Sequence, residues 1–173
     1  MFMSSRDIVT TEARTPVRFA KPQRVAFVQS SWHQDVVGGC WDAFSAEIEA
    51  CGILPAQVDR FEVPGAFEIP LHVQTLAKPR RYTALVAAGL VVDSGLHGYV
   101  AETVIRALMD VQLRTEVPVF SAISTPQGFA ETEEQFAFIR EHFVRKGREV
   151  AQACADTLAS FERLRGQVAA GIM

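Results

Sequence analysis

The sequence has few cysteines, no excess of basic residues and no long apolar run, and each shortage excludes a class of protein. Its three cysteines lie far apart, without the spacing of a disulfide framework or a zinc site. We therefore expect small buried side chains in a reducing, cytoplasmic compartment, and no bound metal. The 17 Lys and Arg residues face 20 Asp and Glu residues, and the resulting net charge of −3 argues against a nucleic-acid binder.

Signals for membranes and export are also missing. The longest apolar run, Ala84–Val92, is far shorter than the roughly 20 residues that span a membrane. Residues 1–23 carry charges of both signs and lack the apolar centre of a signal peptide. We expect a flexible N-terminal arm over residues 1–23, one domain over 24–165 and a C-terminal tail over 166–173.

Apolar segments of strand length alternate with segments of helical period along the chain. This alternation predicts an α/β fold, in which helices cover both faces of a parallel sheet. The expected strands are Arg24–Gln29, Val58–Val63, Tyr82–Val92 and Val117–Ser124. The expected helices are Asp35–Cys51, Ala66–Leu76, Tyr99–Leu113, Glu131–Phe143 and Arg145–Arg165, the last two meeting near Gly147.

Unusual residues follow the strands, where ligands bind in parallel sheets. Trp32 is either a core or interface aromatic or a stacking wall for a planar ligand. Glu68 either complements a helix dipole or binds a polyol beside free backbone N–H groups. His97, in a glycine-rich loop, is a candidate acid and base. Arg140 and His142 lie on either a solvated basic helix face or a phosphate site.

Several segments together resemble the lumazine synthase family, which makes the precursor of riboflavin. The most specific is the run Val63-Pro64-Gly65-Ala66-Phe67-Glu68-Ile69-Pro70. The supporting segments are Phe27-Val28-Gln29, Trp32-His33, Arg81-Tyr82, Glu116-Val117-Pro118-Val119 and Arg145-Lys146-Gly147. The Trp-His pair, Leu71-His72 and His142-Phe143 are most similar to second-type members, which form dimers of pentamers.

The resemblance implies a fold, a reaction and an assembly. The fold is a three-layer α-β-α sandwich around a four-stranded, flavodoxin-like parallel sheet in the order 2-1-3-4. The reaction condenses 5-amino-6-(D-ribitylamino)uracil with 3,4-dihydroxy-2-butanone 4-phosphate to give 6,7-dimethyl-8-ribityllumazine, and needs no cofactor. The assembly is a pentamer or a dimer of pentamers. Val17 and Phe19, apolar residues in the polar arm, agree with a strand added to a neighbour's sheet edge.

The resemblance also assigns roles to individual residues. Trp32 would stack on the pyrimidine, His97 would move protons, and Ser121 would line a neighbouring subunit's site. The remaining assignments are Ala66, Phe67 and Glu68 for the ribityl hydroxyls, Leu90, Val91 and Val92 for the uracil edge, and Ser94, Gly95, Arg140 and His142 for the phosphate.

The chain departs from the family pattern around these residues. The loop after Val92 is shorter and carries Asp93, and the usual histidine position holds Leu96, one residue before His97. The family's phosphate-binding arginine falls near Phe138. Two alternatives therefore stand beside an active enzyme: a non-catalytic relative that binds flavin or lumazine in an oligomer, and an unrelated doubly wound binding module.

Overall fold

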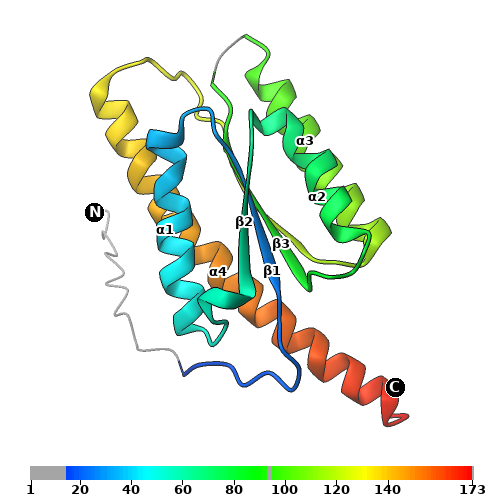
Figure 1. Ribbon diagram of the computed structural model, residues 1–173. Helices are drawn as coiled ribbons and strands as arrows, with labels where there is room; N and C mark the ends of the chain where they lie inside the picture. The colour runs from blue at the N-terminus through cyan, green and yellow to red at the C-terminus, as the bar shows by residue number, and fades with distance from the viewer. Residues whose placement is uncertain (1–14, 93–94, 173) are drawn as a thin grey trace, which may run out of the picture.

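The computed structural model describes residues 15–92 and 95–172 and shows a parallel sheet between two helical layers (Figure 1). The sheet holds β1 (Val25–Ser30), β2 (Val58–Val63), β3 (Ala84–Leu90) and β4 (Val119–Ser124). Its order is β2-β1-β3-β4, and every pairing is parallel. The predicted fold class and strand order are confirmed.

Burial follows from this order. Every residue of β1 and β3 is buried, as expected for central strands covered on both faces, whereas the edge strands β2 and β4 are partly exposed. The long apolar run of the sequence is thus a central strand.

The helices divide between the two faces of the sheet (Figure 1). On one face, α1 (Gln34–Ala50) and α4 (Glu133–Ala169) share a core with Val25, Phe27 and Val86. On the other face, α2 (Ile69–Ala77) and α3 (His97–Thr115) pack on Ala26, Val28 and Leu85. Two short 3₁₀ segments, η1 (Pro55–Gln57) and η2 (Ala66–Glu68), complete the elements.

The predicted break near Gly147 is wrong, because α4 continues through it from Glu133 to Ala169. A Cβ at Gly147 would overlap the carbonyl oxygen of Cys40 and lie 3.0 Å from both the Cβ of Ala43 and the backbone nitrogen of Phe44. The glycine therefore lets α4 cross closely over α1, and its presence in the sequence signals packing rather than a helix end.

Two other boundaries differ from the prediction. The segment after Gly65 begins as the 3₁₀ turn η2, and α2 follows with Pro70 in its first turn, where a missing N–H costs nothing. Helix α3 begins at His97 rather than Tyr99, so this histidine lies on the first helical residue instead of in the loop. The three cysteines are free and buried, as expected, and burial raises the pKa of the Cys40 thiol to about 12.

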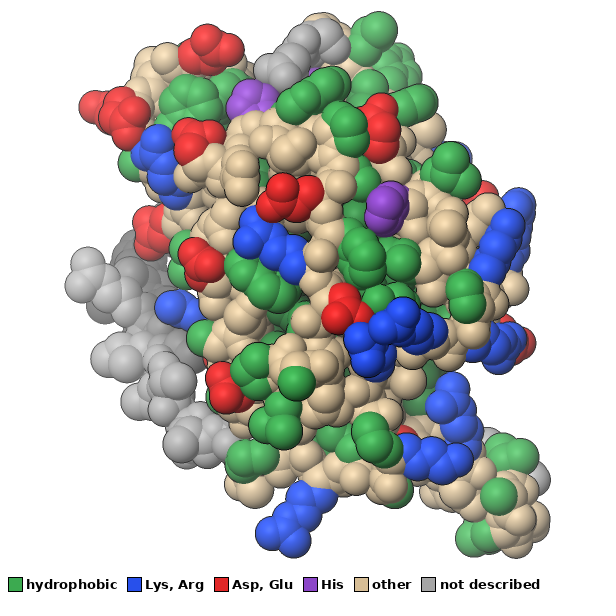
Figure 2. All heavy atoms as spheres, viewed as in Figure 1, with side chains coloured by type: hydrophobic (Ala, Val, Ile, Leu, Met, Phe, Trp, Pro, Cys, Tyr) green, Lys and Arg blue, Asp and Glu red, His purple; other side chains and the backbone are tan. Residues whose placement is uncertain are grey.

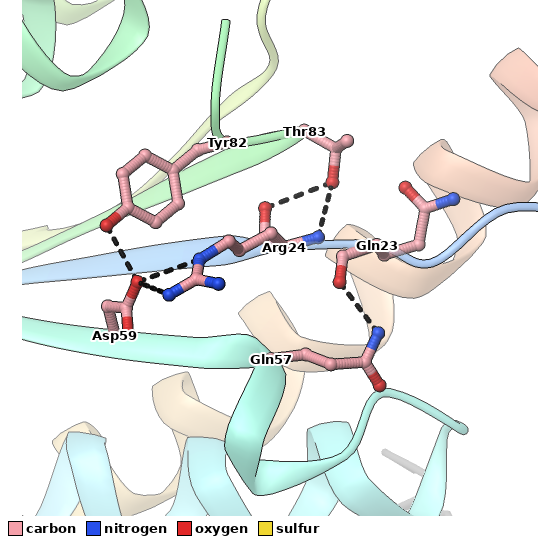
Figure 3. Close-up of polar contacts among 6 residues, drawn as sticks. All are labelled: Gln23, Arg24, Gln57, Asp59, Tyr82 and Thr83. Carbon is pink, nitrogen blue, oxygen red and sulfur yellow. Dashed lines mark hydrogen bonds and ion pairs between the residues drawn. The ribbon is translucent and has the colours of Figure 1, made fainter.

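The amino ends of the strands are joined by a polar cluster (Figure 3). Arg24 donates through Nε and Nη2 to Oδ2 of Asp59, at 3.0 and 2.7 Å, and the Tyr82 hydroxyl donates to the same oxygen at 2.7 Å. These donors lower the pKa of Asp59, with the Tyr82 hydrogen bond as the largest cause. The cluster ties β1 and β2 to the segment that enters β3.

The described part of the arm lies on its own chain. Val17 N–H donates to the carbonyl of Cys51 at 2.9 Å, and Phe19 packs against the core between α1 and α4. The Glu162 carboxylate of α4 accepts the N–H groups of Ala20 and Lys21. The strand added to a neighbouring subunit therefore stays a prediction.

Candidate active site

The carboxyl ends of the strands meet at one edge of the sheet. Ser30 pairs with Val63, and Leu90 pairs with Ser124, so all four strands end at nearly the same level. The loops that leave these ends carry most of the residues that the sequence singles out. They form the candidate site.

Trp32 lies where β1 leaves the sheet. Its N–H donates to the carbonyl of Pro64 at 3.0 Å, and the N–H of Ser31 donates to Val63 at 2.7 Å, so the loop after β1 is tied to the loop after β2. The next residue, His33, adopts a left-handed backbone (φ 58°) and turns the chain into α1. The Trp32 side chain is 61% exposed, which excludes a core aromatic and leaves an interface aromatic and a stacking wall for a ligand as the alternatives.

The turn after β2 presents Glu68 beside Trp32. The Glu68 carboxylate accepts the N–H of Gly65 at 2.9 Å, closing the turn over η2. Ala66 is buried against Gly89 of β3, whereas Phe67 is 65% exposed. An exposed carboxylate therefore lies beside the indole, in the same turn as the exposed Phe67 ring.

The third strand end lies next to this turn. Val91 N–H donates to the carbonyl of Ser124 at 3.0 Å, and Leu90 is buried while Val91 and Val92 are half-buried. Gly95 is exposed, and a Cβ there would meet no atom within 4 Å. The predicted phosphate ligand Ser94 lies outside the described residues.

His97 opens α3, the helix that packs beside η2. Its side chain is half-buried, on the same side of the sheet as Ala66. This placement keeps the imidazole near the carboxyl edge.

Ser121 lies inside β4, three residues before the strand ends, and pairs with Ala87. Its hydroxyl accepts the N–H of Ile123 at 3.3 Å. At about 3.3 Å per residue, Ser121 sits roughly 10 Å below the edge. It is therefore not gathered with Trp32 within one subunit.

Arg140 is already paired. Its Nη1 lies 2.8 Å from Glu133 Oε1, and its Nη2 lies 3.8 Å from Asp35 Oδ2 of α1. The Glu133 hydrogen bond raises the pKa of this guanidinium, followed by the charges of both carboxylates. Two anions already compensate this cation, a feature the helical spacing alone does not reveal.

His142 faces a groove of about 260 Å³. Its Nε2 lies 2.9 Å from Ser124 Oγ, and its Nδ1 lies 3.2 Å from Nη2 of Arg145. A guanidinium only donates, so Nδ1 accepts and Nε2 carries the proton. Burial, followed by the charges of Arg145 and Lys146, lowers the pKa of His142, which favours this neutral form.

The same groove contains an unsatisfied polar atom. Within the part of the chain that the structure describes, Thr125 Oγ1 is buried without a hydrogen-bond partner. Ser124 and Thr125, at the end of β4, line the groove together with Phe138, Ile139 and His142 of α4. The arrangement offers hydroxyl donors to an oxygen-rich group, while both ring nitrogens of His142 are engaged by Ser124 and Arg145.

The predicted residues thus form two groups within one subunit. Trp32, the Ala66–Glu68 turn and His97 lie together at the sheet edge, and the turn and His97 belong to the α2 and α3 side. Arg140 and His142 lie on α4, in the opposite layer. Sequence reasoning assigned no role to Ser124 and Thr125, although both lie in the segment Ser121–Gly128 at the carboxyl end of β4.

The described residues lack both a metal-binding cluster and a membrane-spanning helix. None of their His, Cys, Asp and Glu side chains form a group of three or more that could hold a metal ion. No helix among residues 15–92 and 95–172 is long and apolar enough to cross a membrane.

Comparison with known proteins gives a consistent family. Residues 22–162 match the family model described as 6,7-dimethyl-8-ribityllumazine synthase. The chain is 69% identical to 6,7-dimethyl-8-ribityllumazine synthase 2 of Rhodopseudomonas palustris, over 94% of this chain and 90% of that protein. It is 68% identical to the enzyme of the same name in Bradyrhizobium diazoefficiens, over 90% of this chain and 94% of the relative.

A relative with a different number in its name is more distant. The 6,7-dimethyl-8-ribityllumazine synthase 1 of Caulobacter vibrioides is 33% identical, over 83% of this chain and 94% of that protein. The second-type resemblance of the Trp-His and Leu-His pairs agrees with this difference.

Proposed function

The chain belongs to the 6,7-dimethyl-8-ribityllumazine synthase family, and from this premise we propose how its site makes the lumazine. The protein is a transferase of riboflavin biosynthesis. It condenses 5-amino-6-(D-ribitylamino)uracil with 3,4-dihydroxy-2-butanone 4-phosphate. The observation that carries the assignment of the site is the exposed Trp32 indole lying directly against the Gly65–Glu68 turn.

The ribitylaminouracil occupies the sheet edge. Its flat ring stacks on Trp32, and its ribityl hydroxyls bind the Glu68 carboxylate and the backbone of Ala66 and Phe67. The uracil edge meets the backbone of Leu90, Val91 and Val92. Holding the pyrimidine at three strand ends gives the orientation on which a condensation of two substrates depends.

Proton transfer falls to His97. The 5-amino group adds to the ketone of the butanone phosphate and water leaves, which forms a Schiff base. Removal of the C3 proton then expels inorganic phosphate from C4 and leaves an enol, which tautomerises to a ketone at C3. The ribitylamino nitrogen closes the ring on this new carbonyl with loss of another water. Each stage moves a proton, and an imidazole can take a proton on one ring nitrogen and give one from the other.

The phosphate binds where hydroxyl and cationic groups converge. Ser124 and Thr125 offer hydroxyls in the α4 groove, the neutral His142 orients the Ser124 hydroxyl, and Arg145, which donates to the same imidazole, supplies the positive charge. Arg140 contributes once released from Glu133. Ser94 and Gly95 approach the phosphate from the loop before α3.

The two residue groups lie in opposite layers of one subunit, so a neighbouring copy supplies the second. Ser121 and the α4 groove of one subunit then complete the site at Trp32 of the next. Exposed apolar side chains support such an assembly, and Figure 2 shows hydrophobic surface gathered over the start of α3. They include Trp32, Phe67, Leu71, Leu96, Tyr99, Leu113 and Phe138. A pentamer or a dimer of pentamers in the cytoplasm fits this surface.

Turnover by the purified protein tests the function. Lumazine formation from both substrates, followed by absorbance, should exceed the spontaneous reaction. His97→Ala should lower the rate about 100-fold while the lumazine product still binds, because a positioned acid and base contributes at least that factor. His72→Gln on α2 is the matched control and should keep the rate.

Two results would count against this proposal separately. A wild-type rate equal to the spontaneous one, with tight binding of riboflavin retained, would identify a non-catalytic flavin binder. An active wild type whose rate survives His97→Ala would remove His97 from the mechanism and leave the enzyme.

A further inference from the structure

Gly65 lies beneath the Trp32 ring in the turn that carries Glu68. A Cβ built on Gly65 would lie 2.7 Å from Cε3 and from Cζ3 of the indole, and 3.1 Å from Oε2 of Glu68. Both separations are shorter than ordinary van der Waals contact. Any side chain at residue 65 would therefore compete with the indole and the carboxylate for the same space.

The backbone of Gly65 gives no other reason for a glycine. Its φ of −132° and ψ of 176° are extended values that any residue adopts. Its N–H donates to Glu68 Oε2 at 2.9 Å, a bond that every residue except proline can make. The glycine is therefore required by what lies over it and not by the turn.

We propose that Gly65 is a positioning residue for the lumazine reaction. Because Gly65 has no side chain, the Trp32 indole can lie in contact with the turn, next to the Glu68 carboxylate. The inference rests on the proposed function, in which the indole holds the pyrimidine and the carboxylate holds the ribityl chain. One substrate spans both groups, so their separation has to match the distance between its ring and its chain. Gly65 sets this separation, because it determines how closely the indole approaches the turn.

Because Trp32 is largely exposed, the position of its ring depends on its contact with Gly65. The indole is 61% exposed, so the core does not enclose it on all sides. The backbone bond from Trp32 N–H to Pro64 fixes its Cα, and contact with Gly65 fixes the ring. A methyl group at residue 65 would tilt the indole into solvent, where few contacts oppose the movement.

Gly65→Ala tests the proposal. We expect the lumazine product to bind roughly tenfold more weakly or worse, since overpacking displaces a neighbouring ring. The KM for the ribitylaminouracil should rise by a similar factor, with little change in the KM for the butanone phosphate. Gly38→Ala in α1, where a Cβ would meet nothing within 4 Å, is the control and should bind as the wild type does.

Trp32→Phe identifies the ring as the cause. The overlap involves the six-membered ring of the indole, and phenylalanine is smaller, so Gly65→Ala should change binding by less than about twofold in the Trp32→Phe background. The protein has two tryptophans, and the difference spectrum against Trp32→Phe isolates the fluorescence of Trp32. Gly65→Ala should shift this signal without ligand.

Each outcome decides the proposal. Unchanged product binding and fluorescence in Gly65→Ala would overturn it, as would an equal loss of binding in the Trp32→Phe background. If Gly65→Ala fails to fold, folding of the double variant supports the indole contact, whereas failure of both overturns it. A wild type without turnover contradicts the proposed function instead, because the fluorescence shift requires no reaction.

Discussion

Residues at the two ends of the sheet have different roles. At the carboxyl edge, Trp32 and Glu68 are exposed and available to a ligand. At the amino edge, Asp59 is engaged by Tyr82 and Arg24 (Figure 3). We propose that substrate binds at the edge with available polar groups, whereas the paired groups at the other edge stabilise the fold.

Tyr82→Phe tests the stabilising role of the amino edge. Removing the hydroxyl deletes the 2.7 Å bond to Asp59 and should lower the free energy of unfolding by about 1 kcal/mol at pH 7. The Tyr82 bond holds the pKa of Asp59 below its unfolded value, so this stability is present above about pH 4 and is lost as the pH falls through the folded pKa. The difference between the variant and the wild type should therefore shrink in acid.

Urea unfolding at fixed protein concentration, at pH 7 and again near pH 3, measures this difference. Tyr99→Phe is the control, because Tyr99 is 72% exposed and its change should stay within about 0.5 kcal/mol. An equal loss for Tyr82→Phe at both pH values would show that Asp59 is not responsible.

At the scale of elements, the close crossing of α1 and α4 determines the packing on one face of the sheet. Gly147→Ala should lower the free energy of unfolding by about 2 kcal/mol, because its Cβ would overlap the Cys40 carbonyl. Gly166→Ala in the same helix meets no atom within 4 Å and should raise it by about 0.5 kcal/mol. Thermal unfolding of both variants compares packing with helix propensity, and equal shifts would contradict the close crossing.

The elements also show how far sequence reasoning extends. The strands and their parallel pairing follow from apolar runs such as Ala84–Val92, because burial on both faces leaves a continuous pattern. The role of Gly147 was not predictable, because the residue whose close approach requires a glycine there, Cys40, is far away in the sequence. Local patterns predict elements, whereas close approach between them depends on three-dimensional contacts.

The site was predictable to a similar degree. Trp32 and the Gly65–Glu68 turn each follow an apolar strand in the sequence, so their meeting at one edge of the sheet was predictable. The pairing of Arg140 with Asp35 was not predictable, since it joins two helices, and neither was the contact of His142 with Ser124. Charge partners that come from other elements decide whether a cation remains available, and spacing along one helix does not reveal them.

At the scale of the whole molecule, one subunit holds the parts of two half-sites. Trp32 and His97 lie at the sheet edge, whereas His142 lies in the α4 groove of the opposite layer. In the proposed assembly, a closed ring of identical copies brings the second half of one subunit to the first half of the next. The assembly is then part of the catalyst.

Mixed oligomers test this central claim most directly. Trp32→Ala and His142→Ala proteins, each inactive alone, are unfolded together and refolded at a one-to-one ratio, and lumazine formation is measured. Only an interface that joins an intact Trp32 to an intact His142 is active, so random assembly should restore about a quarter of the wild-type rate. A mixture that stays as inactive as its components would contradict a site shared between subunits.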